Sequence, residues 1–500
     1  MKKISKLLFS LSSSLLIAGN VLAMTSCGGK ETVSGVTTGD VPVVAYDGSN
    51  VTISFYHCMG SALKDILADG IADFNKIYPN IKVLNTSFGD YPGVRDQIST
   101  ELASSRAPSL AYCYPDHVAL YNKSKTVLPL DGWIASTEKA SGSDELMGMT
   151  QAQIDDYVPI YWNEGKIYDE AGTMYTLPML KSTELLYYNV NYFTENNLEV
   201  PTTWDEMEET CRKIIDIESN KTGGLKANPC IPLGYDSSAN WFITMTEQLN
   251  SGYTTAEKGN YFTFDNDVNY EFVERFRSWY QSGYVTTEEI FGSYTSDLFT
   301  QTDPAKTKCY MCIGSSAGAG YQCPDKLSDG KSYPFEVGVA MIPQKDTLEN
   351  LAANEELPQM ISQGPSICLF KKANQQEVAA SWLFAKFLTS NVKFQAKCSM
   401  NNGYTSAIQS IKDNTTYANF LAKADGNAYL QASAVNLTIE MKDYYFVSPA
   451  FNGSSAARDK MAELMKNCFR QEIPSGKTAA DLIKGLFADA KKELQRKYDK

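Results

Sequence analysis

The segment between residues 51 and 84 contains a strand, a helix and a second strand, and this order constrains the fold more than any other feature. The strands are expected at Val51–Phe55 and Ile81–Leu84, where apolar and β-branched residues cluster. Between them, apolar residues recur at helical spacing, at Leu63, Ile66, Leu67, Ile71 and Phe74. A strand–helix–strand unit of this length is typical of a largely parallel sheet covered by helices. The sequence therefore predicts an α/β fold.

The length of the chain indicates two lobes or more, because a single hydrophobic core stops growing at roughly 250–300 residues and this chain has 500. A second block begins near Leu177–Pro178, with a strand at Glu184–Asn189 and a helix that opens at Pro201–Glu206. Thr203 and Glu206 have the spacing of a capping box. Other expected elements are strands at Leu110–Cys113, Lys308–Ile313 and Glu336–Ile342 and helices at Glu377–Thr389 and Ala479–Tyr498.

Charge and histidine content limit the classes of function that this chain can have. The net charge of −13 argues against nucleic acid as a partner, since phosphates need a basic face. The chain has two histidines, His57 and His117, which weakens every reaction class that uses histidine as acid, base or metal ligand. The sequence contains no P-loop, no GxGxxG after a strand and no HExxH motif. We therefore expect no nucleotide, no metal and no other cofactor.

The first 26 residues have the pattern of a secretion signal. Lys2, Lys3 and Lys6 form a positive region, and Leu7–Leu22 is an apolar, serine-rich stretch. Small residues directly before Cys27 resemble a bacterial lipobox, which implies cleavage before Cys27 and lipidation of its sulfur. Two acyl chains suffice for stable anchoring. An uncleaved anchor with an incidental cysteine is the alternative.

Residues 27–50 are expected to be a flexible tether, because residues 28–50 are rich in glycine, serine and threonine. No later segment of the sequence resembles a transmembrane helix. The protein is therefore predicted to lie outside the cytoplasm, anchored to the membrane by lipid.

Ten cysteines remain after Cys27, at positions 58, 113, 211, 230, 309, 312, 323, 368, 398 and 468. Outside the cytoplasm they could form five disulfides, although a body of this size does not need them. Cys309 and Cys312 have the CxxC spacing of metal or redox sites. Because residues three apart in a strand face opposite sides, these two are expected to be buried thiols instead.

Two enzymatic possibilities follow from short patterns. Gly314–Gly318 matches the G-x-S-x-G turn of α/β-hydrolases, but their triad needs a histidine later in the chain, and both histidines come earlier. The pattern is better explained by a small-residue turn that opens a helix and offers N–H groups and hydroxyls to a polar ligand. Abundant aspartate and glutamate leave a glycosidase open, although no motif singles out a pair.

Aromatic residues make up 12% of the chain, with 30 tyrosines. Such rings can stack on sugars, with polar side chains fixing the hydroxyl groups. The alternative is that most of them belong to the hydrophobic core.

Short motifs follow one another along the chain from residue 51 to the end. They are Phe55–Gly60, Phe74–Pro79, the segment around Tyr91, Arg106–Pro108, Leu177–Asn189, Pro201–Trp204, Cys312–Ser316, Phe335–Pro343, Trp382–Thr389 and Asn402–Tyr404. Their order resembles the extracellular solute-binding proteins of carbohydrate ABC importers. The particular resemblance is to the branch with glycerol-3-phosphate-binding and maltodextrin-binding proteins.

This resemblance implies a two-lobed periplasmic-binding-protein fold of type II, which closes on its ligand like a hinge. The chain would cross between the lobes three times, near residues 180, 337 and 400. One lobe would then contain residues 51–180 and 338–399, and the other 181–337 and 400–500.

The resemblance also implies which residues line the cleft between the lobes. They are His57, Met59, Tyr91, Asp116, Ser182, Trp241, Ser315, Ser316, Gly364 and Tyr404. Trp241 would be the stacking platform from the second lobe, and the two adjacent serines would offer hydroxyl and N–H groups. His57 and Trp241 could instead be core residues.

Two departures from the family pattern affect the expected ligand. At the third crossing the family often has Gly-Tyr-Leu-Pro, whereas this chain has Gly403–Ser406. Phosphate-binding relatives place an arginine in a late loop, but the corresponding Ser448–Gly453 has none, and the nearest is Arg458. Because burying a phosphate without a cation is costly, these residues favour a neutral sugar or oligosaccharide.

The predicted function is therefore that of a lipid-anchored, monomeric substrate-binding subunit of an ABC importer, not an enzyme. Its partners would be a carbohydrate-like solute and the permease subunits in the membrane. Two alternatives remain from the sequence: a surface glycoside hydrolase, and an adhesin or scaffold lipoprotein that kept the fold without a ligand.

Overall fold

The first of two five-stranded sheets contains the predicted strand–helix–strand unit. Its strand order is β2 (Ile81–Ser87), β1 (Val51–His57), β3 (Leu110–Cys113), β12 (Ser366–Leu369), β4 (Thr176–Pro178). β1 runs parallel to β2 and β3, whereas β12 is antiparallel to both of its neighbours. The helix α1 (Ser61–Ile77) joins the parallel β1 and β2, which confirms the α/β prediction.

The structure is a computed structural model that describes residues 33–324, 333–423 and 430–499. The predicted signal sequence, Cys27 and the start of the predicted tether lie outside the described residues. Within the described ranges, no helix has the length and apolar character needed to cross a membrane.

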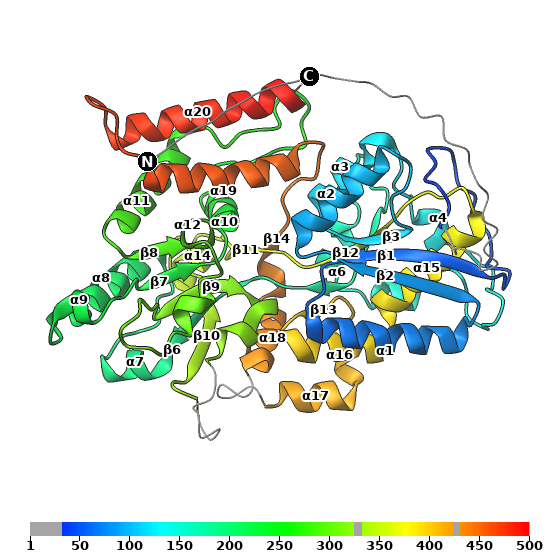
Figure 1. The fold of residues 1–500 in the computed structure, drawn as a ribbon, viewed down its shortest axis with the longest axis horizontal. Coiled ribbons are helices and arrows are strands. Elements are labelled where there is room, and N and C mark those ends of the chain that lie inside the picture. The colour runs from blue at the N-terminus through cyan, green and yellow to red at the C-terminus, as the bar shows by residue number, and fades with distance from the viewer. Residues whose placement is uncertain (1–32, 325–332, 424–429, 500) are drawn as a thin grey trace, which may run out of the picture. The chain divides into compact units, whose positions relative to one another are not determined.

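The second sheet gathers strands from the middle of the chain. Its strand order is β10 (Val337–Met341), β6 (Glu184–Asn189), β9 (Met311–Ser315), β7 (Leu233–Tyr235), β8 (Val285–Thr287). β6 is antiparallel to β10 and β9, and β7 is parallel to β9 and β8. We call the parts of the chain around the two sheets the first lobe and the second lobe (Figure 1).

Helices cover both sheets. The chain up to β4 adds α2 (Tyr91–Leu102), α3 (Pro115–Tyr121), α4 (Asp131–Ile134), α5 (Gln151–Asp155) and α6 (Pro159–Glu164). Between β6 and β10 it adds α7 (Val190–Glu195), α8 (Trp204–Asn220), α9 (Gly224–Ala227), α10 (Ser238–Gln248), α11 (Asp267–Gln281), α12 (Glu288–Phe291) and α13 (Ser296–Phe299). After β10 come α14 (Leu348–Ala353), α15 (Gln375–Ser390), α16 (Val392–Asn402), α17 (Thr415–Leu421), α18 (Leu430–Glu440), α19 (Ser454–Arg470) and α20 (Ala479–Tyr498).

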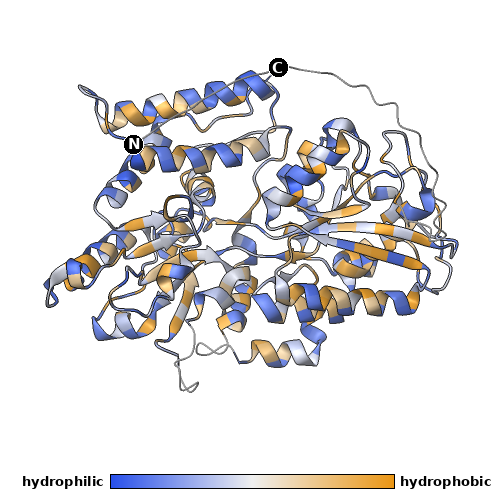
Figure 2. Cartoon of the chain, viewed as in Figure 1, coloured by the Kyte–Doolittle hydropathy of each residue, from blue (hydrophilic) through white to orange (hydrophobic). Residues whose placement is uncertain are grey.

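Local sequence patterns fix the ends of several helices. Thr203 caps α8 and forms the predicted capping box with Glu206, since each side chain bonds to the other residue's backbone. The predicted C-terminal helix is found with the same bounds as α20. Figure 2 shows apolar residues gathered along the strands and along the helix faces that pack on them.

Short strand pairs lie where the chain passes between the lobes. β5 (Leu180–Lys181) pairs with β13 (Thr405–Ser406), and β11 (Met360–Ile361) pairs with β14 (Tyr445–Phe446). The crossing expected near residue 337 lies later in the chain, because β10 pairs antiparallel with β6 and so belongs to the second sheet. The chain rejoins the first sheet at β12.

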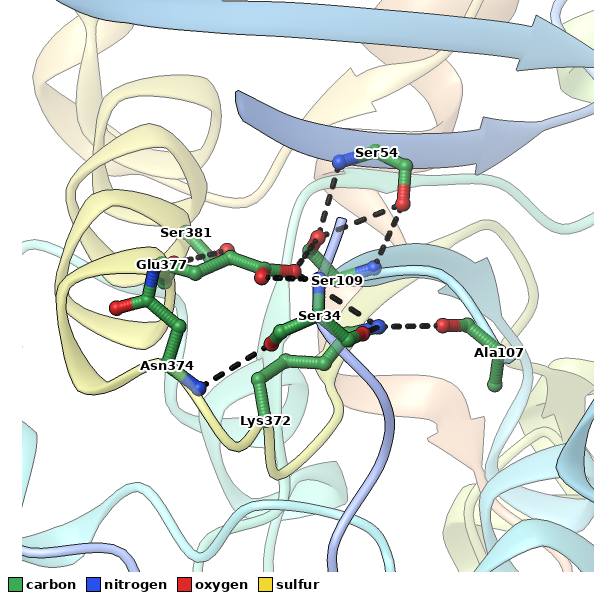
Figure 3. A network of polar contacts seen from close by, with 8 residues as sticks. All are labelled: Ser34, Ser54, Ala107, Ser109, Lys372, Asn374, Glu377 and Ser381. Atoms are coloured by element: carbon green, nitrogen blue, oxygen red, sulfur yellow. Dashed lines mark hydrogen bonds and ion pairs between the residues drawn. The ribbon is translucent and has the colours of Figure 1, made fainter. Parts of the chain in front are cut away.

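Residues 33–50, which the sequence assigns to a flexible tether, are hydrogen-bonded to the first lobe. The Ser34 amide donates to Glu377 Oε2 at 2.7 Å, and Lys372 Nζ donates to the Ser34 carbonyl at 2.9 Å. Figure 3 shows these groups beside Ser109, whose hydroxyl donates to Glu377 Oε1 at 2.7 Å. The side chains of Lys372 and Glu377 are buried, so the backbone of Ser34 satisfies groups that water does not reach. These contacts correct the tether prediction for this part of the chain.

The described thiols lie mostly in the interior. Cys309 and Cys312 are both buried, as expected, with Cys312 inside β9 and Cys309 just before it. Among the described residues, no group of histidine, cysteine, aspartate and glutamate has the arrangement of a metal site.

Candidate functional site

A cavity between the two lobes is the strongest candidate for a functional site. Its empty space is about 550 Å³, a volume that includes open solvent at its mouth. The first lobe contributes the turn from β3 into α3, and the second lobe contributes the start of α19 and the loop before it. Among the residues that line it are Tyr114, Asp116, Tyr253, Gly364 and Arg458.

Two helix starts bring polar groups to this cavity. α3 begins at the carboxyl end of β3 with Pro115 in its first turn, followed by Asp116. α19 begins after Gly453, whose φ of +129° and close approach to the Tyr498 ring leave no room for a Cβ. α19 packs against α3, and the first-turn residues Asp116 of α3 and Ser454 of α19 both line the cavity.

Two residues of the cavity wall each carry a polar atom that has no hydrogen-bond partner among the described residues. The Oδ2 atom of Asp116 and the hydroxyl of Tyr253 are buried and make no hydrogen bond among the described residues. Buried polar groups are normally satisfied. A ligand with hydroxyl groups would supply a donor for the carboxylate and an acceptor for the tyrosine.

A cation also faces this cavity. Arg458 lines it and donates from Nη1 to the Oδ1 atom of Asn240 on α10. The loop Ser448–Gly453 contains no arginine, and Arg458 is the nearest one in the sequence. Since α19 starts directly after that loop, one helical turn returns Arg458 to the loop's end, and this corrects the argument against a phosphate-bearing ligand.

Three of the predicted cleft residues adjoin the cavity. Asp116 and Gly364 line it. Gly364 has a φ of +99°, and a Cβ there would lie 2.3 Å from the Leu180 carbonyl, so the loop can pass this close to the first crossing only as glycine. Ser182 is bridged through its backbone to Gln363, which lines the cavity, with both N–H···O distances at 2.9 Å.

Tyr91 and Tyr404, also predicted, form an aromatic cluster with Tyr114, and of the three it is Tyr114 that lines the cavity. The rings of Tyr91 and Tyr114 stack with centroids 4.2 Å apart. Tyr404 is hydrogen-bonded to Tyr91, and burial raises the pKa of the Tyr404 hydroxyl to about 12. The sequence analysis missed Tyr114, although it directly follows the predicted strand 110–113, where site residues of parallel sheets are expected.

The remaining predicted residues lie elsewhere or have internal partners. Trp241 is fully buried in the core of the second lobe, which corrects its assignment as a stacking platform. His57 and Met59 are buried in the core of the first lobe. Ser315 caps the 3-10 helix that follows it, and the Ser316 hydroxyl accepts from the Thr183 amide.

An ion pair joins the lobes beside the cavity. Arg95 of α2 donates from Nη1 to Ser455 Oγ and to Asp459 Oδ2 on α19, both at 2.9 Å. Asp459 directly follows Arg458. The helix that carries the cation of the cavity is therefore also bonded to the opposite lobe.

The buried His57 predicts an acid-sensitive stability. Burial lowers the pKa of His57 to about 4, whereas the unfolded value is about 6.5. The stabilisation from neutral His57 is therefore present above pH 6.5 and is lost as the pH falls toward 4. We expect the free energy of unfolding to fall by on the order of 2 kcal/mol from this group between pH 7 and pH 5. Urea unfolding of the native protein and His57→Asn at both pH values measures it, and an equal pH dependence in the two would contradict the expectation.

Comparison with known proteins identifies relatives. The family model for bacterial extracellular solute-binding proteins matches residues 70–427. The sn-glycerol-3-phosphate-binding periplasmic protein UgpB of Brucella abortus is 23% identical over 391 residues, which cover 75% of this chain and 78% of that protein. UgpB of Escherichia coli K12 is 24% identical over 388 residues, with the same coverage.

Solved structures share the fold at low identity. UgpB of Mycobacterium tuberculosis in complex with glycerophosphocholine has a TM-score of 0.65 and 16% identity, covering 89% of this chain and 98% of that one. The maltose/maltodextrin-binding domain MalE of Bdellovibrio bacteriovorus bound to maltotriose has a TM-score of 0.63 and 16% identity. The match covers 89% of this chain and 100% of that one. These similarities establish the predicted two-lobed, type II periplasmic-binding fold.

Proposed function

Since the chain belongs to the bacterial extracellular solute-binding proteins, we propose that it is the lipid-anchored substrate-binding subunit of an ABC importer. It captures a polyhydroxyl solute between its lobes and delivers it to permease subunits in the membrane. Membership of this family makes it a solute-binding protein and not an enzyme.

The cavity between the lobes is the observation that carries this proposal. Asp116 from the first lobe and Arg458 and Tyr253 from the second reach the same space. A ligand that bonds to both lobes binds the closed arrangement more tightly than the open one, and only this difference in affinity can drive closure. Delivery to a permease requires such a ligand-dependent change.

The polar groups of the cavity suit a sugar or a phosphorylated polyol. The carboxylate of Asp116 accepts hydrogen bonds from hydroxyl groups, and the guanidinium of Arg458 donates to hydroxyl or phosphate oxygens. Tyr114, with the ring of Tyr91 stacked against it, supplies apolar surface for a sugar ring or a polyol carbon chain.

The proposal places the protein outside the cytoplasm, as a monomer whose Cys27 carries two acyl chains after removal of residues 1–26. The sequence pattern around Cys27 supports it. Mass spectrometry of the protein purified from membranes tests the modification. An unmodified Cys27, or an uncleaved N-terminus, would contradict it.

A thermal-shift screen of the mature protein tests the function, with mono- and oligosaccharides, polyols and glycerophosphates as candidates. A ligand at 100 times its Kd adds about 2.7 kcal/mol of stability. We expect a shift with one class only. No shift from any compound, or turnover of a glycoside, would contradict the proposal.

Replacing Arg458 by glutamine is expected to weaken binding of the solute found in that screen about 10- to 100-fold, because a charge-assisted hydrogen bond contributes roughly 1.5–3 kcal/mol. Isothermal titration calorimetry measures the affinity. Arg106→Gln is the matched control, since Arg106 is an exposed arginine outside the cavity. Equal affinities in the native protein and in Arg458→Gln would remove Arg458 from the site.

A further inference from the structure

A chain of hydrogen bonds runs from Arg458 in the cavity wall into the core of the second lobe. Arg458 donates to Oδ1 of Asn240, and the Nδ2 atom of Asn240 donates to Glu184 Oε1 at 3.0 Å. The other carboxylate oxygen, Glu184 Oε2, accepts from the hydroxyl of Tyr235 at 2.6 Å. Glu184 is the first residue of β6, is 1% exposed, and has no part in the cavity wall.

The charge state of Glu184 decides which way the amide of Asn240 points. An ionised carboxylate only accepts hydrogen bonds, so it must face the NH₂ group of Asn240. The amide oxygen is then directed at Arg458, which only donates. A neutral group at position 184 carries a donor of its own and can also bond to the amide oxygen. The neutral form therefore no longer fixes the orientation that holds Arg458.

We propose that Glu184 is a positioning residue for Arg458, which acts through Asn240 and ties the placement of the guanidinium to the ionisation of a buried carboxyl. The role of Arg458 in solute binding rests on the proposed function. The bond chain itself does not, and it can be tested in the protein without a ligand.

The groups that face Glu184 place its ionisation near neutral pH. Burial raises the pKa of Glu184 to about 7, the hydroxyl of Tyr235 and the amide of Asn240 oppose this rise, and the charge of Asp236 adds to it. Arg458 on α19 lowers the value. Ser315, which pairs with Glu184 across β6 and β9, is neutral. Glu184 thus changes charge within the pH range in which the folded protein can be studied.

The direct test is the side-chain ¹⁵Nε resonance of Arg458 in ¹⁵N-arginine-labelled mature protein, assigned with Arg458→Lys. We expect this resonance to shift with a midpoint near pH 7 in the native protein and to show no such step in Glu184→Gln. In Asn240→Ala the carboxyl still titrates but the hydrogen-bonded connection is cut, so the step should shrink to the part that the direct charge interaction of Glu184 with Arg458 produces. An unchanged step in either variant would overturn the proposal.

Glu288→Gln is the matched control for this titration. Burial raises the pKa of Glu288 to about 7 as well, and the charged groups that add to this rise are Glu289, Asp236 and Asp90, not Arg458. The step in the Arg458 resonance should therefore persist in this variant. Its loss would show that the resonance reports general charge in the second lobe, and would overturn the assignment to Glu184.

A binding measurement separates positioning from a merely structural role. The probe is sn-glycerol 3-phosphate, titrated by calorimetry at pH 6 and pH 8. We expect Glu184→Gln to bind at least threefold more weakly than the native protein at pH 8 and equally at pH 6, where the native carboxyl is also neutral. An equal loss at both pH values, or tighter binding at pH 8, would overturn the proposal. If the native protein does not bind the probe, the result counts against a glycerophosphate ligand, and the ligand-free resonance decides on Glu184.

Discussion

Replacing Lys181 by methionine is expected to lower the free energy of unfolding by about 3–5 kcal/mol, because it leaves a buried carboxylate without its partner. Lys181 lies on β5, at the first crossing between the lobes, and forms an ion pair with Glu164 of α6. The two side chains are 0% and 3% exposed. Lys181 also reaches the hydroxyl of Ser366 on β12, so one ammonium group connects the crossing to the first sheet.

Urea unfolding at pH 7 measures this loss, and the double variant Lys181→Met with Glu164→Gln tests its cause. If the unpaired charge is responsible, the double variant should recover much of the stability that the single variant loses. Lys393→Met is the matched control, because Lys393 pairs with Asp73 at the surface with 63% of its side chain exposed. Such a pair contributes about 0–1 kcal/mol. A loss of that small size in Lys181→Met would contradict the expectation.

The elements that the sequence predicts well are those fixed by neighbouring residues. The strand at Glu184–Asn189 and the C-terminal helix Ala479–Tyr498 have the predicted bounds. The capping box of Thr203 and Glu206 joins residues three apart, so its geometry depends on the local chain alone. In the same way, periodicity places α1 between two parallel strands without any knowledge of the rest of the fold.

Features that depend on pairing between distant segments could not be located in this way. The crossing expected near residue 337 is displaced because β10 pairs with β6, about 150 residues earlier in the chain, and no local pattern records that pairing. The contact of Ser34 with Lys372 and Glu377 is similar. A stretch rich in small polar residues is typical of a tether, but here its backbone completes the hydrogen bonds of a buried ion pair.

The candidate site shows the same division. Asp116 and Gly364, which the resemblance implied as cleft residues, both line the cavity. The expectation of a neutral ligand came from the lack of an arginine within Ser448–Gly453, with Arg458 as the nearest one. The start of α19 at Ser454 shortens the distance in space between Arg458 and that loop. Asn240 and Glu184 are the residues that hold Arg458, and no sequence pattern points to them. Their role arises only because α10 and β6 pack beneath α19.

Trp241→Ala is expected to lower the free energy of unfolding by about 3–5 kcal/mol, the usual cost of removing a large buried aromatic side chain. Trp241 is 0% exposed. Its ring stacks against Phe276 and Tyr235, with centroids 4.1 and 4.9 Å away, and packs against Trp279. Its Nε1 atom has no hydrogen-bond partner among the described residues, so the loss comes from packing alone.

The expected effect of Trp241→Ala on solute affinity is small, whereas loss of a residue that stacks on the solute would lower the affinity strongly. Because no part of the Trp241 ring reaches the cavity, folded Trp241→Ala should bind solute within about threefold of the native protein, while Trp241→Phe should recover part of the lost stability. Urea unfolding and calorimetry at a temperature where the variant stays folded provide both quantities. A large loss of affinity with unchanged stability would return Trp241 to the ligand site. The same result would mean that the lobes rearrange around α10 when the solute binds, since only such a change could bring this ring out of the core.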